Sequence, residues 1–257
     1  MLLGQYRSFA VHGIPAGPGL ELCRSLQRNG LNTAYIQFDG VTSALYIALR
    51  GKDMLPIKLK AVDNMRRVGY TSLALVPTLT RGVNDNQVGS IVRFASGKLD
   101  IIKGINFQPV SFFSGRIDAS ERTEKRLTIP DFLSLQEKQT DNRITREDFY
   151  PVPFVGLVAK LIAAEMGAGP SRPSWPTHAA ELRPISTSRE GKVLPITRFL
   201  DVEALMDRIG RGVENFDGSS LGKLKMRGMI LKEIPKFVDE AKVPDGVNIT
   251  KLLLSVF

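Results

Sequence analysis

Four apolar runs rich in β-branched residues lie within the first 111 positions, and a segment able to form a helix separates each run from the next. The runs are RSFAVHG (7–13), TAYIQFDG (33–40), TSLALVPT (71–78) and IIKGINFQPVS (101–111). Strands that alternate with helices over short connections require right-handed crossovers and a parallel sheet. Four such units cannot close an eight-stranded barrel, so the sequence predicts an α/β protein with an open sheet or a partial barrel.

Small polar clusters follow these runs. In parallel α/β folds, ligands bind just beyond the carboxyl ends of the strands. We therefore expect one group of polar side chains to line one face of one sheet. Its members are Gln37, Asp39, Arg81, Asn84, Asn106, Gln108 and Ser111.

Gln37 and Asp39 are two residues apart at the end of the second run, so they are expected to point to the same side. A carboxylate in this place commonly accepts hydrogen bonds from ribose hydroxyls or from a substrate amine. The alternative is that Asp39 caps the turn that follows it. The residues alone leave both interpretations open.

Arg81 lies in the loop after the third run, where its guanidinium can clamp a carboxylate or a phosphate. The alternative is a surface ion pair with Asp85. Asn106 and Gln108 share a face of the fourth run, and an unsatisfied buried amide costs about 1–3 kcal/mol. This spacing favours a ligand or an ordered water near the two amides.

Composition narrows the function classes. The formal charge is +9, and two basic groups contribute to it: Lys58, Lys60, Arg66 and Arg67, and residues 223–236. No nucleic-acid motif accompanies them, so we expect solvated helix faces and no nucleic-acid partner, while a weak preference for anionic substrates or membrane surfaces stays open. No apolar run approaches the ~20 residues of a membrane span, and the start MLLGQYR lacks a signal sequence, which predicts a cytoplasmic protein without a transmembrane segment.

The chain has one cysteine, Cys23, on the apolar side of a predicted helix. It excludes an intramolecular disulfide and a cysteine-ligated cluster built from this chain alone. We expect Cys23 to be a buried packing residue. His12 and His178 are the only histidines, and neither has a partner at metal-ligand spacing, so no metal-binding residue is predicted.

The β/α rhythm ends after Ser111, which predicts a partial barrel over 1–125 and a mostly helical region over 126–257. Thr128 begins a predicted helix that runs to about Gln139. Further helices are expected at about 155–166, 201–210, 221–231 and 249–255, with a linker at 167–176. A small hairpin is expected near 183–197.

Several longer strings resemble members of the radical S-adenosylmethionine superfamily, and they occur in the same order. They are TAYIQFDGVTSALYIALRGKD, LALVPTLTRGVNDNQVGSIVRFA, IKGINFQPVSFFSGR, RLTIPDF, DFYPVP and LPITRFLDVE. The resembling group is archaeal and comprises tetraether lipid synthase and the pterin C-methylating enzymes of methanogens. The resemblance runs from about residue 31 to 205.

The resemblance implies a partial TIM-type (β/α) barrel with S-adenosyl-L-methionine and a [4Fe-4S] cluster as cofactors. The implied chemistry is radical C–C bond formation or C-methylation on a lipid or pterin-like small molecule. It implies cofactor contacts for Gln37, Asp39, Asn84, Asn106 and Gln108. It also implies substrate contacts for Arg81, Ser111 and Arg116.

The cluster-binding cysteines of this family are missing from the sequence. Phe154 stands where the family often has cysteine, and residues 174–180 read SWPTHAA in place of a cysteine-rich patch. A thiolate cannot be replaced by Ala or Phe at an iron site. We therefore expect a truncated or split product, a degenerate relative or a misassigned start. The cysteine-rich N-terminal half would then be a separate polypeptide, or the chain would be a non-catalytic binding or partner subunit.

Overall fold

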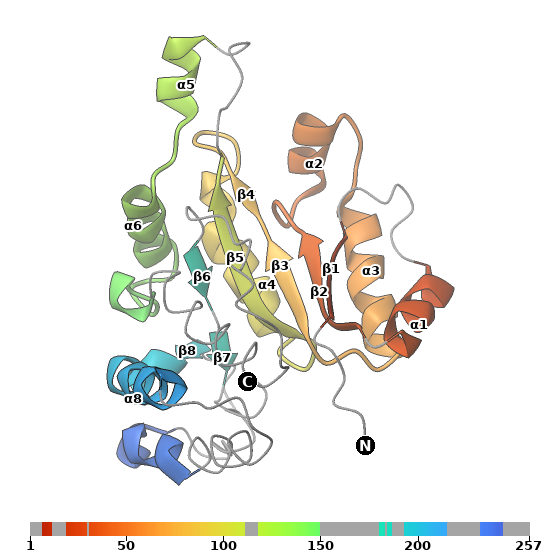
Figure 1. The fold of residues 1–257 in the computed structure, drawn as a ribbon. Coiled ribbons are helices and arrows are strands. Elements are labelled where there is room, and N and C mark those ends of the chain that lie inside the picture. The colour runs from red at the N-terminus through yellow and green to blue at the C-terminus, as the bar shows by residue number, and fades with distance from the viewer. Residues whose placement is uncertain are drawn as a thin grey trace.

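The computed structural model describes residues 7–11, 19–29, 31–110, 118–149, 180–182, 184–186, 193–214 and 232–243. Its centre is a sheet with the strand order β1-β2-β3-β5-β4. These five strands pair in parallel, which confirms the predicted α/β class (Figure 1). The strands are β1 (Arg7–Val11), β2 (Leu31–Gln37), β3 (Leu73–Val76), β4 (Thr78–Leu79) and β5 (Ile102–Pro109).

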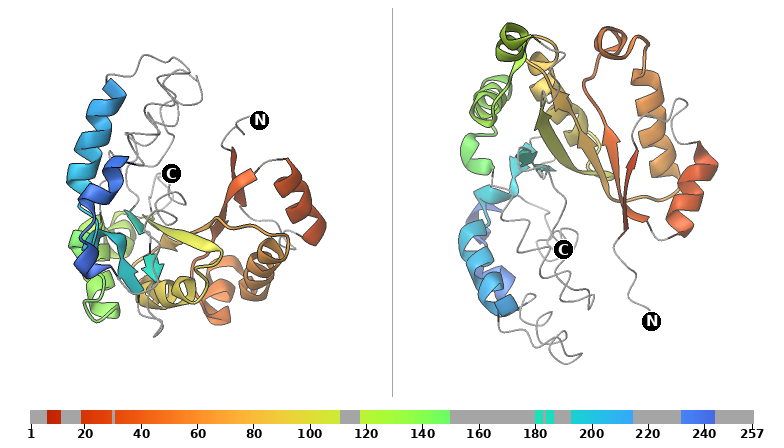
Figure 2. Two further views of the ribbon diagram at one scale, coloured as in Figure 1. Left: turned by 90° about the horizontal axis from the view of Figure 1, so that it is seen from below. Right: turned by 45° about the horizontal axis from the view of Figure 1, so that its top comes forward.

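Helices connect the strands as the alternating pattern predicts. They are α1 (Leu20–Arg28), α2 (Ser43–Arg50), α3 (Leu55–Arg67) and α4 (Val88–Ser96), the last preceded by the 3-10 turn η1 (Asp85–Gln87). Figure 2 shows α3 and α4 on the same side of the sheet. The residues that follow β2 and β3 therefore bury one face of the sheet and leave the other for the rest of the chain.

The register fixes which side chains lie on each face. Ile36 pairs with Leu75, and Leu75 with Ile105, and all three are fully buried against the helices. Phe38, which follows β2, stacks on Phe94 of α4 with ring centroids 4.7 Å apart. This helix-covered face holds most of the hydrophobic core.

The opposite face, which we call the open face, is more polar. Tyr35 pairs with Ala74, and Ala74 with Gly104, so the residues two and four positions further along β5 also lie on it. Those residues are Asn106 and Gln108. The alternation along the strands thus separates an apolar face from a face that carries amides.

After β5 the chain forms α5 (Ala119–Lys125) and α6 (Ile129–Gln139). The predicted helix start at Thr128 is confirmed. Thr128 accepts a hydrogen bond from the Asp131 amide, and the Asp131 carboxylate accepts one from the Thr128 amide. The α5 helix was not predicted; Asp118 caps it by accepting a hydrogen bond from the Ser120 amide.

The later segments add three short strands. β6 (Ala180–Leu182) pairs antiparallel with β5, an addition to the sheet that the sequence did not predict. β7 (Pro184–Ser186) pairs antiparallel with β8 (Val193–Pro195), which confirms the predicted hairpin strands. The remaining elements are η3 (Ile196–Arg198), α8 (Val202–Glu214), η4 (Ile234–Phe237) and η5 (Glu240–Lys242).

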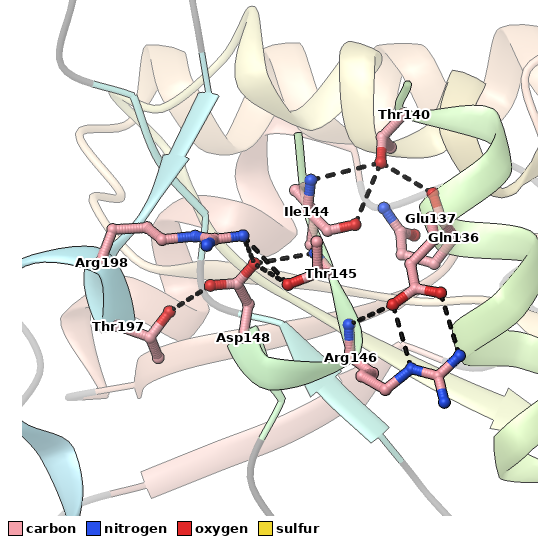
Figure 3. Close-up of polar contacts among 9 residues, drawn as sticks. All are labelled: Gln136, Glu137, Thr140, Ile144, Thr145, Arg146, Asp148, Thr197 and Arg198. Carbon is pink, nitrogen blue, oxygen red and sulfur yellow. Dashed lines mark hydrogen bonds and ion pairs between the residues drawn. The ribbon is translucent and has the colours of Figure 1, made fainter. Parts of the chain in front are cut away.

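A buried ion pair joins the end of the α6 region to η3 (Figure 3). Asp148, in the turn η2 (Arg146–Asp148), accepts hydrogen bonds from Arg198 Nη2 at 2.8 Å and from Thr197 Oγ1 at 2.6 Å. It also accepts one from the Thr145 amide at 2.8 Å. Since residues on both sides of 150–179 meet here, this contact fixes the start of α8 against the first half of the chain.

Some expectations were wrong and others lie outside the described residues. The sequence suggests Asp53 as the cap of the helix that begins near residue 55; Met54 occupies the N-cap position, while Asp53 Oδ1 accepts a hydrogen bond from the Leu55 amide. The sequence also suggests Asp85 or Asn86 as the N-cap of the helix that begins near residue 87, and neither is one, because Asn84 precedes η1 and Gln87 precedes α4. The division at 125/126 stays a prediction. The expectations outside the described residues concern Ser111, Arg116, His12, His178, Phe154, the linker and the helices at 155–166, 221–231 and 249–255.

Among the described helices, none is long and apolar enough to cross a membrane.

Candidate functional site

Polar side chains from three strands meet on the open face, near the carboxyl ends of β2 and β5. We call them the polar row: Gln37, Thr78, Asn106 and Gln108. Thr78 pairs with Gln108 in the sheet, and Gln37 Nε2 donates to Thr78 Oγ1 at 3.2 Å. The two predicted amide positions of β5 are thus brought to the same end of the sheet as the predicted end of β2.

Asp39 lies beside this row and is 1% exposed. Its Oδ1 accepts hydrogen bonds from Gln37 Nε2 and from the Thr78 amide, each at 3.1 Å. Its Oδ2 accepts one from Arg50 Nη2 at 2.8 Å. The bond between Gln37 and Asp39 agrees with their predicted common direction, and the carboxylate joins β2 to β4 rather than only capping a turn.

Asn84 is fully buried and its amide is satisfied within the protein. Its Nδ2 donates to the backbone carbonyls of Asp39 at 2.9 Å and Thr78 at 2.8 Å, while its Oδ1 accepts from the Thr80 amide at 2.8 Å. With both ends of the amide engaged, Asn84 holds the loop after β2 against the loop after β3. Asn84 would therefore support a site by fixing these two loops and not by contacting a ligand.

Arg81 bonds to residues at the start of α6, although its position in the loop after β3 suggested a place beside the polar row. Its Nη2 donates to Asp131 Oδ2 at 2.7 Å, and its Nε donates to the Arg126 carbonyl at 2.9 Å. The expected alternative, an ion pair with Asp85, is wrong because the N-terminal turn of α6 brings Asp131 closer. Arg81 therefore secures the start of α6, and its side chain remains about half exposed.

Asn106 is the residue of the row whose polar atoms are least satisfied. It is 4% exposed, and its Oδ1 has no hydrogen-bond partner among the described residues. Gln108, two residues further along, is half-buried. An unpaired acceptor in this environment costs about 1–3 kcal/mol, so a donor from a bound molecule would be strongly favoured there.

Three residues near Asp39 were not assigned to a site from the sequence. Tyr46 donates from its hydroxyl to the Gly40 carbonyl at 3.2 Å, and its pKa is raised above its ordinary value by burial and by the nearby Asp39 charge. Arg50 pairs with Asp39, and Lys58 is only 8% exposed. The expectation that Lys58 belongs to a solvated basic face is wrong.

A sequence signal for the burial of Lys58 was present. Lys58, Val62 and Met65 follow the i, i+4, i+7 spacing of one helix face, and Val62 and Met65 are buried core residues. Lys58 thus lies on the apolar face of its helix. Grouping it with Lys60, Arg66 and Arg67 by charge hid this indication that it is buried.

The chain does not offer the ligands of an iron–sulfur cluster. Its one cysteine, Cys23, is fully buried as predicted, and burial raises the pKa of its thiol. The described ranges contain no group of three or more His, Cys, Asp or Glu side chains arranged to hold a metal ion. Since such a cluster is held by several thiolates, these residues do not fit it.

A parallel sheet with helices in its connections, and with amides on its open face at the carboxyl ends of the strands, defines an α/β protein. No family model matches the chain. The chain is 43% identical to 7,8-dihydro-6-hydroxymethylpterin dimethyltransferase from Methanocaldococcus jannaschii over 234 residues. That alignment covers 91% of this chain and 46% of the relative, so the chain spans about half the length of that curated relative.

The similarity confirms the predicted resemblance to the archaeal pterin-methylating group of the radical S-adenosylmethionine superfamily. Among solved structures, that of TYW1 with a lysine-pyruvate adduct bound aligns with a TM-score of 0.38 and 15% identity. The alignment covers 69% of this chain and 56% of the other. A TM-score of this size supports no conclusion about the site.

Proposed function

We propose that this chain is the S-adenosylmethionine-facing and substrate-facing part of a radical S-adenosylmethionine C-methyltransferase that acts on a pterin-like or lipid small molecule. The similarity to a pterin dimethyltransferase supports the reaction class. The observation that carries the binding site is the buried, unpartnered Asn106 Oδ1 on the open face. The remainder of the enzyme would belong to another part of the polypeptide or to a separate one.

S-adenosylmethionine fits the residues of the polar row. Its adenine amine and ribose hydroxyls are donors of the kind that Asn106 Oδ1 lacks, and Gln37 and Gln108 lie on the same face within reach of one ligand. Asp39 and Asn84 support this site by holding the loops after β2 and β3. The bound cofactor supplies the radical chemistry of the family, and the role of these residues is to bind and orient it.

The [4Fe-4S] cluster does not fit this chain, so we assign no cluster ligand to it. A cysteine-rich polypeptide would have to supply the thiolates. For the substrate, Arg81, Ser111 and Arg116 remain the proposed contacts. Arg81 would need to exchange Asp131 for a substrate carboxylate or phosphate, which its half-exposed position permits.

Isothermal titration of the full chain with S-adenosylhomocysteine, which has the same adenosyl group and no reactive sulfonium, tests the binding site. The variant Asn106→Leu removes the unpaired acceptor and is expected to weaken binding by at least about tenfold. Gln136→Leu is the matched control, because Gln136 is also a buried amide without a partner among the described residues but lies on α6 beside Phe132, which packs against the helix-covered face. Equal affinities for the wild type and Asn106→Leu would reject the proposed site.

The alternative is a non-catalytic binding or partner subunit derived from this fold, and the single cysteine is the observation in its favour. The two functions differ in what a cysteine-rich partner would restore. We expect an anaerobic mixture with a cysteine-rich polypeptide encoded beside this chain, reconstituted with iron and sulfide and reduced with dithionite, to cleave S-adenosylmethionine to 5′-deoxyadenosine, and Asn106→Leu to reduce that cleavage. Cleavage by the partner alone, unchanged when this chain is added, would favour the non-catalytic role.

A further inference from the structure

A second polar cluster lies at the carboxyl end of β2, where α2 ends and α3 begins (Figure 1). Arg50 is the last residue of α2, and Lys58 lies in the first turns of α3. Both are near Asp39, the only carboxylate that pairs with either cation among the described residues. The cluster therefore contains two cations and one anion.

Lys58 is unusual for a lysine because most of its side chain is buried. The residue is 8% exposed, and its ammonium interacts electrostatically with Asp39 and Arg50. Burial lowers its pKa, Asp39 acts in the opposite direction, and the Arg50 charge lowers it further. A lysine whose aliphatic chain is buried keeps its ammonium at the surface of the cluster, so this ammonium is placed to receive an anion beside Arg50.

Arg50 has unused donors in the same place. Its guanidinium presents a fork of N–H donors, and the hydrogen bond from Nη2 to Asp39 Oδ2 uses one of them. The Arg50 side chain is 47% exposed, so the rest of the fork is open to an incoming molecule. Asp39 also accepts hydrogen bonds from Gln37 and the Thr78 amide, which leaves little of its capacity for Lys58.

The start of α3 adds to the positive potential. This helix runs for 13 residues, and the Asp53 carboxylate accepts a hydrogen bond from the amide of its first residue, Leu55. The other amides of the first turn have no side-chain acceptor from the N-cap residue, Met54, so the positive end of the helix dipole adds to the charges of Lys58 and Arg50.

We propose that Arg50 and Lys58 form a binding site for an oxyanion, the phosphate or carboxylate group of a small-molecule ligand. The anion would pair with the Lys58 ammonium and with the free side of the guanidinium fork, while Asp39 keeps the fork in place. The anion-binding donors come from α2 and α3, whereas the proposed S-adenosylmethionine contacts come from the polar row; the two sites share only Asp39, which supports both. Because phosphate and acetate carry no adenosyl group, titration with these anions tests the anion site separately from the proposed S-adenosylmethionine site.

Thermal unfolding and calorimetric titration of the full chain with sodium phosphate test the site, with sodium chloride at matched ionic strength as the reference. A parallel titration with sodium acetate distinguishes a phosphate site from a carboxylate site. We expect one of the two anions to raise the midpoint of unfolding above the chloride reference. Absence of any phosphate-specific or acetate-specific effect would overturn the proposal.

Three variants assign the effect to residues. Lys58→Met keeps the buried volume and removes the charge, so it is expected to lower the anion affinity at least about tenfold without lowering the midpoint in chloride. Arg50→Gln changes a half-exposed residue and is expected to weaken binding similarly. Lys60→Met, an exposed position on the same helix, is the control and should bind like the wild type. Equal losses of anion affinity in Lys58→Met and Lys60→Met would show that any positive charge on α3 has the same effect, and would overturn the proposal.

Discussion

Arg198 donates from Nη2 to Asp148 Oδ2 at 2.8 Å, and this ion pair connects residues that are 50 positions apart. The Asp148 side chain is 2% exposed, whereas that of Arg198 is 36% exposed. Thr145 and Thr197 complete the hydrogen bonding of the carboxylate. The contact is therefore a satisfied buried carboxylate with one partly solvated cation, and it positions the segment that leads into α8.

Removing the cation should destabilise the protein. In Arg198→Met, Asp148 keeps its threonine donors but loses its charge partner, and the partial exposure of Arg198 limits the loss to about 1–2 kcal/mol. Urea unfolding of the variant measures the change. Arg67→Met is the matched control, because the pair of Arg67 with Asp63 on α3 is exposed on both sides and should contribute less than about 0.5 kcal/mol. Equal losses in the two variants would show that the buried pair has no special role.

The close approach of α4 to the end of α6 depends on Gly89. A Cβ at this position would lie 2.4 Å from the Gln139 carbonyl oxygen and 2.9 Å from the Gln139 Cβ. Gly89→Ala must therefore move one helix, and we expect it to cost about 1–3 kcal/mol in unfolding free energy. In Gly97→Ala, at the end of the same helix, the new Cβ would meet only ordinary contacts at 3.7 Å and beyond, so its midpoint should change little.

The parallel sheet could be predicted from the sequence because the patterns that indicate strands and helices involve residues close together in the chain. The alternation of buried and half-buried residues from Ala34 to Gln37 in β2 follows from strand geometry, and the capping residues of α6 lie within one turn of each other. The same reasoning placed Gln37, Asn106 and Gln108 on one face. These features require no knowledge of distant residues.

The parts that the sequence missed depend on distant contacts. Asp131 lies 50 positions from Arg81, so nothing local favoured it over Asp85 as the ion-pair partner. The addition of β6 to β5 depends on a pairing between residues 105–107 and 180–182. Lys58 was assigned to a basic surface group because of its charge, although its spacing from Val62 and Met65 indicated a buried position. Because of this error the cluster around Asp39 was not predicted.

Stability should depend on pH through the N-cap of α6. Hydrogen bonds from Thr128, first its amide and then its hydroxyl, hold the pKa of Asp131 below its ordinary value. Because the folded-state pKa is the lower one, this contribution is fully present above the unfolded-state value of about 4 and is lost as the pH falls through the folded-state pKa. Asp131→Asn should therefore be less stable than the wild type at pH 7, and the difference should shrink between pH 5 and pH 2.

Urea unfolding at several pH values measures that difference. Thr128→Val removes the hydroxyl partner while leaving Asp131 in place, and it should reproduce part of the loss at pH 7 and less of it at low pH. A stability difference that stayed constant from pH 7 to pH 2 would show that the carboxylate charge is not what stabilises the helix start.

The state of Cys23 decides whether this chain on its own can take part in iron chemistry. Cys23 is fully buried and packs in the hydrophobic core, and burial raises the pKa of its thiol. Only the thiolate reacts with alkylating reagents and binds iron, so both reactions should be suppressed in the folded protein. Labelling with iodoacetamide at pH 8 is expected to be at least about a hundredfold slower in buffer than in denaturant, since it requires opening of the core.

Anaerobic incubation with iron and sulfide tests the same residue for metal binding. We expect no cluster absorbance in either the wild type or Cys23→Ala. Absorbance that appears in the wild type and is lost in Cys23→Ala would assign the thiol a role in metal binding.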